Sequence, residues 1–206
     1  MAYPQSLINA WQSERLVYRA IEDNEVDTKL LWELTVNDPI SVGMGSTLLL
    51  APSALTKMTK LLSLKSGNLL HVFICLKVTE EEKESSATPT PIGRVALFPE
   101  FSDGPHHRNM LLGITIGDGY RGKGYGGEAI NWALDWGFMR AGLHRIGLGC
   151  FSYNPAGLKL YRKLGFVEEG RERESVLFER KWHDIILFGM LEHEWEALRG
   201  VGKKES

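Results

Sequence analysis

A glycine-rich stretch with two cations is the part of the chain whose residue types point most directly to chemistry. Residues 117–127 read Gly-Asp-Gly-Tyr-Arg-Gly-Lys-Gly-Tyr-Gly-Gly, between a predicted apolar strand, Leu111–Ile116, and a helical pattern that begins at Glu128. Glycines let the backbone approach a ligand closely, and the first amides of a helix have no partner within it. The helix dipole and the charges of Arg121 and Lys123 favour an anion. The stretch therefore predicts a phosphate-binding loop.

Three known sequence motifs, or a plain connection between two elements, could account for these residues. A Walker A loop fails because Gly124 stands where a Ser or Thr should hold magnesium. The dinucleotide fingerprint, placed on Gly122–Gly127, needs a ribose-binding carboxylate after the next predicted strand, Arg145–Cys150, and none follows it. The pattern Gln/Arg-x-x-Gly-x-Gly/Ala begins at Arg121. A mere connection would rarely place four glycines in six residues between cations and a helix start.

The sequence after the loop favours the third pattern. An Asn-Pro stretch runs from Asn154 through Tyr161 to Gly165-Phe166. With these motifs in this order and at this separation, residues 109–166 resemble the GNAT superfamily of N-acetyltransferases, most of all its ribosomal-protein and spermidine acetyltransferase branch.

The resemblance implies one three-layer α/β/α domain over residues 1–206, with a central, mostly antiparallel mixed sheet of about seven strands that splays at the cofactor site. It implies acetyl-CoA as co-substrate. No metal is expected, since no metal-ligand spacing is present in the sequence. A backbone N–H near Ile114 would polarise the thioester carbonyl. The residues implied to bind the co-substrate are Ile114, Thr115, Ile116, Arg121, Gly122, Lys123, Gly124, Tyr125, Gly126, Gly127 and Asn154.

Asn154 and Tyr161 are seven residues apart, which places them about two turns apart on one helix face. In the family, the asparagine contacts the cofactor and the tyrosine is the general acid for the leaving thiolate. A phenol titrates near ~10, so Tyr161 would keep its proton at neutral pH. From the residues alone, Tyr161 is also a candidate core aromatic, and Asn154 a helix cap.

The general base and the acceptor stay open at this stage. Glu100, Asp103, Glu168 and Glu174 lie near the expected site loops, although each is typical of a surface carboxylate, and water could relay the proton. The first predicted helix is acidic, which would attract a cationic amine but is also ordinary for a solvated helix face. Its acidic residues are Glu22, Asp23, Glu25, Asp27, Glu33 and Asp38.

Periodicity and turn residues predict the elements that would position this site. Further strands are predicted at residues 15–20, 69–78 and 92–98, from 166, and at 184–191. Helices are predicted from residue 22 to 38, from 52 to 64, from 128 to 142 and from 155 to 165. The remainder is expected to form an N-terminal arm at 1–12, a loop at 43–47 and a mobile low-complexity loop at 79–91. A polar tail is expected from Glu192 onward, with 196–206 as the tail of the single domain.

Composition limits the class of protein. With 206 residues, 43% of them hydrophobic, and a net charge of −2, the chain fits a single domain and gives no reason to expect nucleic-acid binding. Cys75 and Cys150 lie in apolar runs and are expected to be buried thiols. Neither a signal peptide nor a membrane-spanning run is recognisable, so a cytoplasmic protein is expected, either monomeric or homodimeric.

The leading hypothesis is an acetyl-CoA-dependent N-acetyltransferase that acetylates the primary amine of a small molecule by direct attack in a ternary complex. An enzyme that acetylates protein N-termini by the same chemistry is the alternative. A non-catalytic acyl-CoA-binding sensor of the same fold is a third hypothesis, against which the glycine loop and Tyr161 both argue.

Overall fold

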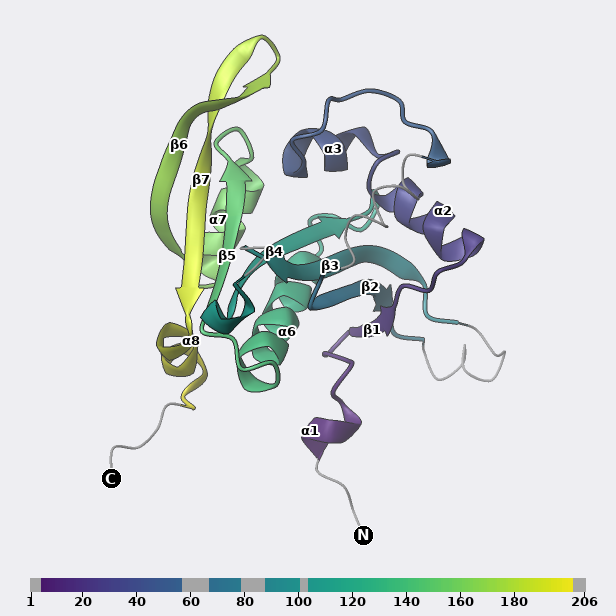
Figure 1. Cartoon of the computed structure of the whole chain (residues 1–206). Helices are drawn as coiled ribbons and strands as arrows, with labels where there is room; N and C mark the ends of the chain where they lie inside the picture. Colours follow the sequence, from purple (N-terminus) through teal and green to yellow (C-terminus); the bar gives the residue numbers. More distant parts are fainter. Residues whose placement is uncertain (1–4, 57–66, 79–87, 101–103, 202–206) are drawn as a thin grey trace.

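The computed structural model describes residues 5–56, 67–78, 88–100 and 104–201. In these residues, strands form one sheet in the order β1-β2-β3-β4-β5-β7-β6 (Figure 1). Neighbouring strands are antiparallel except β4 and β5, which are parallel. The strands are β1 (Leu16–Ala20), β2 (Leu70–Leu76), β3 (Pro91–Pro99), β4 (Asn109–Ile116), β5 (Arg145–Phe151), β6 (Val167–Phe178) and β7 (Lys181–Leu191).

Helices cover both faces of this sheet, which confirms the three-layer mixed architecture (Figure 1). The larger core cluster includes residues of α6, α7 and α8 on one face, and the smaller cluster joins α2 to β2 on the other. The helical elements are α1 (Gln5–Ile8), α2 (Glu25–Leu34), α3 (Pro39–Gly45), the 3-10 turn η1 (Pro105–His107), α6 (Tyr125–Met139), α7 (Pro155–Lys163) and α8 (Glu192–Arg199).

The helix after the glycine loop packs as its sequence predicts. Ile130, Ala133, Leu134 and Phe138 recur at helical spacing, and each is at least 96% buried. Trp132 extends this face by stacking on Tyr18 of β1, with ring centroids 3.6 Å apart. These contacts fix α6 across the sheet and so fix the position of the loop that precedes it.

The predicted first helix is shorter than expected, and a second helix that was not predicted follows it. α2 ends at Leu34, and Asp38-Pro39, expected to end a helix, instead begins α3 over most of the predicted 43–47 loop. The Asp38 carboxylate accepts a hydrogen bond from the N–H of Ile40, which is the geometry of a helix N-cap with proline in the first turn.

The C-terminal segment also differs from expectation. Residues 192–199 form α8, so any polar tail starts later than predicted. The reason is Trp195, which is 95% buried and donates its indole N–H to Asp135 on α6 at 2.8 Å. The predicted helix at 52–64 and the predicted loop at 79–91 lie largely outside the described residues.

Further expectations from the sequence concern the two cysteines and the N-terminal arm. Cys75 and Cys150 are buried and unpaired, as expected. The described part of the N-terminal arm contacts the domain, because the carbonyl of Ala10 accepts a hydrogen bond from the indole N–H of Trp132 on α6 at 3.1 Å. No helix among the described residues is long and apolar enough to cross a membrane.

Candidate functional site

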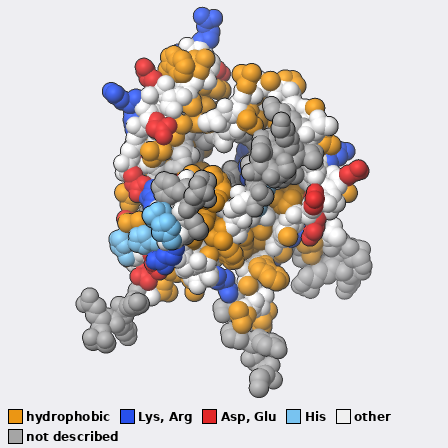
Figure 2. Space-filling view, viewed as in Figure 1, with side chains coloured by type: hydrophobic (Ala, Val, Ile, Leu, Met, Phe, Trp, Pro, Cys, Tyr) orange, Lys and Arg blue, Asp and Glu red, His pale blue; other side chains and the backbone are white. Residues whose placement is uncertain are grey.

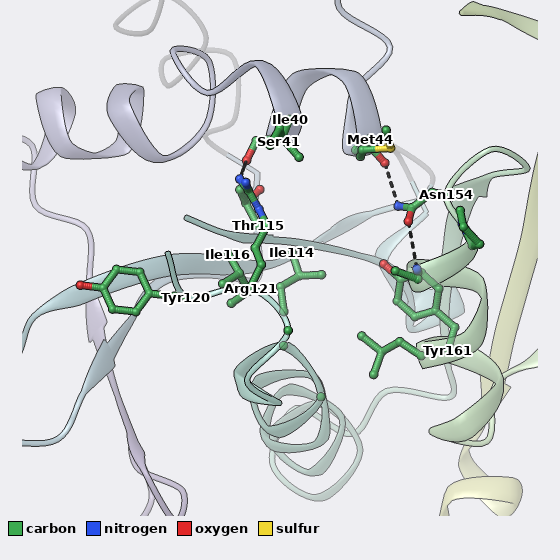
Figure 3. A pocket seen from close by; sticks show the side chains of 18 of the residues that line it. Ile40, Ser41, Met44, Ile114, Thr115, Ile116, Tyr120, Arg121, Asn154 and Tyr161 are labelled. Carbon is green, nitrogen blue, oxygen red and sulfur yellow. Dashed lines mark hydrogen bonds between the residues drawn. The ribbon is translucent and has the colours of Figure 1, made fainter. Parts of the chain in front are cut away.

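A cavity of about 560 Å³ lies where β4, the glycine loop, α7 and α3 meet (Figure 3). Figure 2 shows the molecule hollowed between the β6–β7 hairpin and the segment that carries α3. The lining residues come from these four parts of the chain and from the turn between β5 and α7: Ile40, Ser41, Met44, Gly45, Ile114, Thr115, Ile116, Tyr120, Arg121, Gly122, Gly124, Gly126, Gly127, Tyr153, Asn154, Pro155, Ala156, Gly157, Leu160 and Tyr161.

The sheet opens at this cavity. β4 pairs with β5 only at residues 109–111, although β4 continues to Ile116 and β5 to Phe151. The N–H of Gly117 donates to Ile92 of β3 at 2.8 Å. Because successive peptide groups of a strand alternate in direction, those of Ile114 and Ile116 face the β5 side. This part of β4 therefore presents a free backbone edge to the cavity.

The glycine loop brings backbone amides to one end of the cavity. Gly119, Gly122 and Gly124 have φ values of 77°, 75° and 87°, in the left-handed region that side chains disfavour. Gly124 is the N-cap of α6 and supplies no side chain to cap the first amides of the helix. These amides are suited to bind an oxyanion group such as a diphosphate.

Arg121 leaves this loop and reaches across the cavity to α3 (Figure 3). Its guanidinium forms a hydrogen-bonded ion pair with Asp38 and donates to the hydroxyl of Ser41 at 3.0 Å. Burial acts to raise the pKa of the Asp38 carboxyl, but hydrogen bonds from Ser41 and Arg121 outweigh it and lower the pKa from its usual value. Arg121 is thus bound to a carboxylate that the sequence analysis had placed among possible amine-attracting acids.

Lys123 and Tyr125 are predicted binding residues whose side chains do not line the cavity. The ammonium of Lys123 lies 5.8 Å from the ring centroid of Tyr120, and the ring of Tyr125 packs against the guanidinium of Arg15 at 4.6 Å. Only the backbone groups of these two residues are placed to take part. The other predicted positions, from Ile114 to Gly127 and at Asn154 and Tyr161, all contribute to the lining.

Asn154 joins two helices. Its side-chain oxygen accepts from the N–H of Gly157 at 2.9 Å and caps α7, while its Nδ2 donates to the carbonyl of Met44 at 3.1 Å (Figure 3). Next to it, the hydroxyl of Tyr153 donates to the carbonyl of Gly43 at 2.9 Å. The C-terminal end of α3 is therefore held by the start of α7, while Arg121 holds its N-terminal end.

Tyr161 projects from α7 into the same space as Ile114 and Asn154 (Figure 3). Its ring packs edge-on against Phe166 at 6.0 Å and tilted against Phe188 at 5.9 Å. Burial raises the pKa of the phenol above its usual value. The side chain is thus both part of the core and a protonated group at the cavity wall.

None of the three described candidate bases lines the cavity. Glu168 pairs with Arg162 at 2.8 Å, Glu100 lies 3.9 Å from Arg145, and Glu174 is an exposed residue of the hairpin. The fourth, Asp103, is outside the described residues.

Sequence reasoning missed the contribution of α3. Ile40, Ser41 and Met44 line the cavity, although residues 43–47 were expected to form a loop. The Asp38-Pro39 pair carried the missing signal, because Asp at an N-cap followed by Pro at the first helical position is a helix start.

Sequence comparison assigns the family. The model of the acetyltransferase (GNAT) family matches residues 61–166, which span the sheet opening, the glycine loop and α7. The chain belongs to the GNAT family of acetyltransferases. It is therefore related to enzymes that transfer acetyl groups, as the resemblance in the sequence implied.

Relatives of this GNAT protein include enzymes with named substrates. A prophage-derived uncharacterized N-acetyltransferase of Bacillus subtilis is 23% identical over 94% of this chain and 99% of its own length. Spermidine N(1)-acetyltransferase of Vibrio cholerae is 34% identical, over 43% of this chain and 51% of the relative. The alanine N-acetyltransferase of ribosomal protein uS5 from Escherichia coli is 30% identical, over 49% of this chain and 52% of the relative. The chain thus matches about half the length of the two relatives with known substrates.

Solved structures share the fold. The spermidine N-acetyltransferase of Vibrio cholerae in complex with CoA and spermine has a TM-score of 0.71 and 23% identity, with 89% of this chain and 99% of that chain covered. A GNAT-family acetyltransferase of Bacillus anthracis has a TM-score of 0.68 and 20% identity, with 88% and 98% covered. At these identities the likeness shows the architecture alone.

Proposed function

We propose that this GNAT protein uses acetyl-CoA to acetylate the primary amine of a small molecule, by direct attack in a ternary complex. The observation that carries the proposal is the free edge of β4, at Ile114–Ile116, which opens into a cavity walled by the glycine loop at one end and by Tyr161 at the other. This arrangement fits a long thioester with a diphosphate at one end.

The residues present fit such a molecule. The amides of Gly122–Gly127 would hold the diphosphate, and the backbone edge of β4 would pair with the amide groups of the pantetheine arm. Bound acetyl-CoA supplies an activated acetyl thioester. The N–H of Ile114 would polarise the thioester carbonyl, and Tyr161 would hold a proton at its hydroxyl for the departing sulfur. The amine would lose its proton to water, since none of the described candidate bases lines the cavity.

The roof of the cavity favours a small acceptor over a protein N-terminus. α3 is tied at both ends, by Arg121 to Asp38 and by Asn154 to Met44. The β6–β7 hairpin closes the neighbouring side, because Phe178 stacks on Tyr153 at 4.3 Å. A cavity whose walls are held in place by these contacts suits a small amine.

A thiol-release assay over a panel of small amines and short peptides, together with calorimetric titration of CoA, tests this function. We expect CoA to bind and small amines to release thiol faster than peptides do. Tight CoA binding without thiol release from any acceptor would favour the non-catalytic sensor, and faster release with peptides would favour N-terminal acetylation. Failure to bind CoA would exclude all three.

A further inference from the structure

Arg94 on β3 is a half-buried cation with no carboxylate partner among the described residues. Four other arginines of that part of the chain are similarly half-buried, and each pairs with an acid: Arg19 with Asp27, Arg121 with Asp38, Arg145 with Glu169, and Arg199 with Asp135. A guanidinium stays charged in proteins, and a charge withdrawn from water is unfavourable unless it is paired. Burial accordingly lowers the pKa of Arg94. The position calls for an anion.

Arg94 is not itself a lining residue of the cavity, but the strand register places it next to one. Arg94 is directly opposite Thr115 of β4, and Thr115 lines the cavity. Directly opposed residues of antiparallel strands have Cβ atoms about 5 Å apart on one face of the sheet. Ile114 and Ile116 pack on the core cluster that contains α6, so Thr115 and Arg94 lie on the other face, toward α2 and α3.

The least exposed of the described acids on this face do not offer a free charge to a polycation. Asp27 accepts two hydrogen bonds from Arg19, at 2.6 and 2.7 Å, and Asp38 is paired with Arg121. The two acids of this region with the lowest exposure are therefore already neutralised, while the Arg94 cation is not. The acceptor side of the cavity is better matched to a negative group than to a second positive one.

We propose that Arg94 binds a carboxylate of the acceptor, so that the acceptor is a small amino acid rather than a polyamine. This inference rests on the proposed function, because it assumes that the amine is acetylated at the opening between β4 and β5. Arg94 is one strand away from that opening, and adjacent strands are about 4.8 Å apart. With the reach of an arginine side chain, this spacing suits molecules whose amine and carboxylate are separated by a few carbons.

Matched pairs of acceptors test the proposal. Each α-amino acid, β-alanine and 4-aminobutanoate would be assayed for thiol release against its own carboxamide, which keeps the amine and loses the negative charge. We expect kcat/KM of the wild-type protein to be at least about tenfold higher for the best acid than for its amide. Arg94→Gln should abolish this preference by raising KM for the acid, with KM for acetyl-CoA unchanged, and Arg94→Lys should retain part of it.

Arg108→Gln is the matched control, because Arg108 is exposed and donates to the carbonyl of Gly142, away from the cavity. Equal use of acids and amides by the wild-type protein, or an acid preference that survives Arg94→Gln, would overturn the proposal while leaving the acetyltransferase function intact. Circular dichroism would show whether each variant is folded. If Arg94→Gln does not fold, the partial acid preference expected of Arg94→Lys provides the test instead.

A binding measurement keeps the two proposals separable. Titration calorimetry with N-acetylglycine and with its amide, with and without CoA, needs no turnover. Binding of the acid alone that is lost in Arg94→Gln and kept in Arg108→Gln supports the carboxylate site even if no acceptor in the panel releases thiol. Absence of acid binding to the wild-type protein overturns it even if amines are acetylated.

Discussion

At the scale of single residues, the position of Tyr161 is compatible with both of the roles that the sequence left as alternatives. Its ring packs against Phe166 and Phe188, and its side chain also lines the cavity beside Ile114. A phenol buried in this way keeps its proton to a higher pH, since burial penalises the phenolate and raises the pKa. Packing therefore supports its use as a proton donor.

Replacement of Tyr161 by Phe isolates the hydroxyl, because the ring and its packing remain. We expect kcat to fall about 10²-fold, which is typical of a lost general acid, with little change in the Kd of CoA. In the wild-type protein, Tyr161 should impose no fall in kcat between pH 7 and 9, because its raised pKa keeps the acid form over that range. Rapid thiol detection across pH measures both quantities, and equal losses in kcat and CoA affinity would contradict the donor role.

At the scale of elements, α3 is tied to the rest of the cavity by side chains from two other elements. Arg121 of the glycine loop holds Asp38 at its start, and Asn154 holds the carbonyl of Met44 near its end. Arg121 and Asn154 were both predicted to contact the co-substrate. Binding of a diphosphate at the glycine loop should therefore compete with Asp38 for Arg121.

Charge removal at Asp38 tests this competition. Asp38→Asn should lower the Kd of CoA about threefold to tenfold, where tenfold is ~1.4 kcal/mol, because Arg121 is then released to a diphosphate. Arg121→Gln should raise that Kd. Titration calorimetry at low and high salt gives both values, with Glu33→Gln as a control, since Glu33 is exposed and pairs only weakly with Lys29 at 4.0 Å. Weaker CoA binding in Asp38→Asn would instead mean that the ion pair shapes the cavity.

At the scale of the whole molecule, the C-terminal helix closes the layer formed by α6. Trp195 stacks with Phe138 at 5.4 Å and donates to Asp135, and Arg199 binds Asp135 and Asn131 at 2.7 and 2.9 Å. The helix is thus part of the core that holds α6, and through α6 it supports the glycine loop.

Truncation of Trp195 measures this support. Trp195→Ala should lower the free energy of unfolding by about 3–5 kcal/mol, because it removes a buried aromatic side chain. Trp195→Phe should cost only about 1 kcal/mol, for one lost hydrogen bond and a smaller ring. Urea unfolding would measure both, with the exposed His193→Ala as the control on the same helix. An unchanged stability of Trp195→Ala would mean that residues 192–199 contribute as little as the predicted polar tail.

The sequence alone determined the features that depend on neighbours along the chain. The glycine loop, the strand before it, and the cap of α7 at Asn154 follow from local backbone preferences and from unpaired amides at helix starts. The buried face of α6 follows from its periodicity. These local signals and the family resemblance together predicted the fold and ten of the twenty residues that line the cavity.

Only the tertiary structure decided which charged groups meet. Arg121 and Asp38 are 83 residues apart, and Asn154 is 110 residues from Met44, so no local pattern could pair them. The docking of α8 likewise depends on Asp135, 60 residues before Trp195. Arg94 looks like any arginine in the sequence. In the folded structure, every other described arginine with comparable burial lies next to an acid. Arg94, which is opposite Thr115, has no such partner among the described residues.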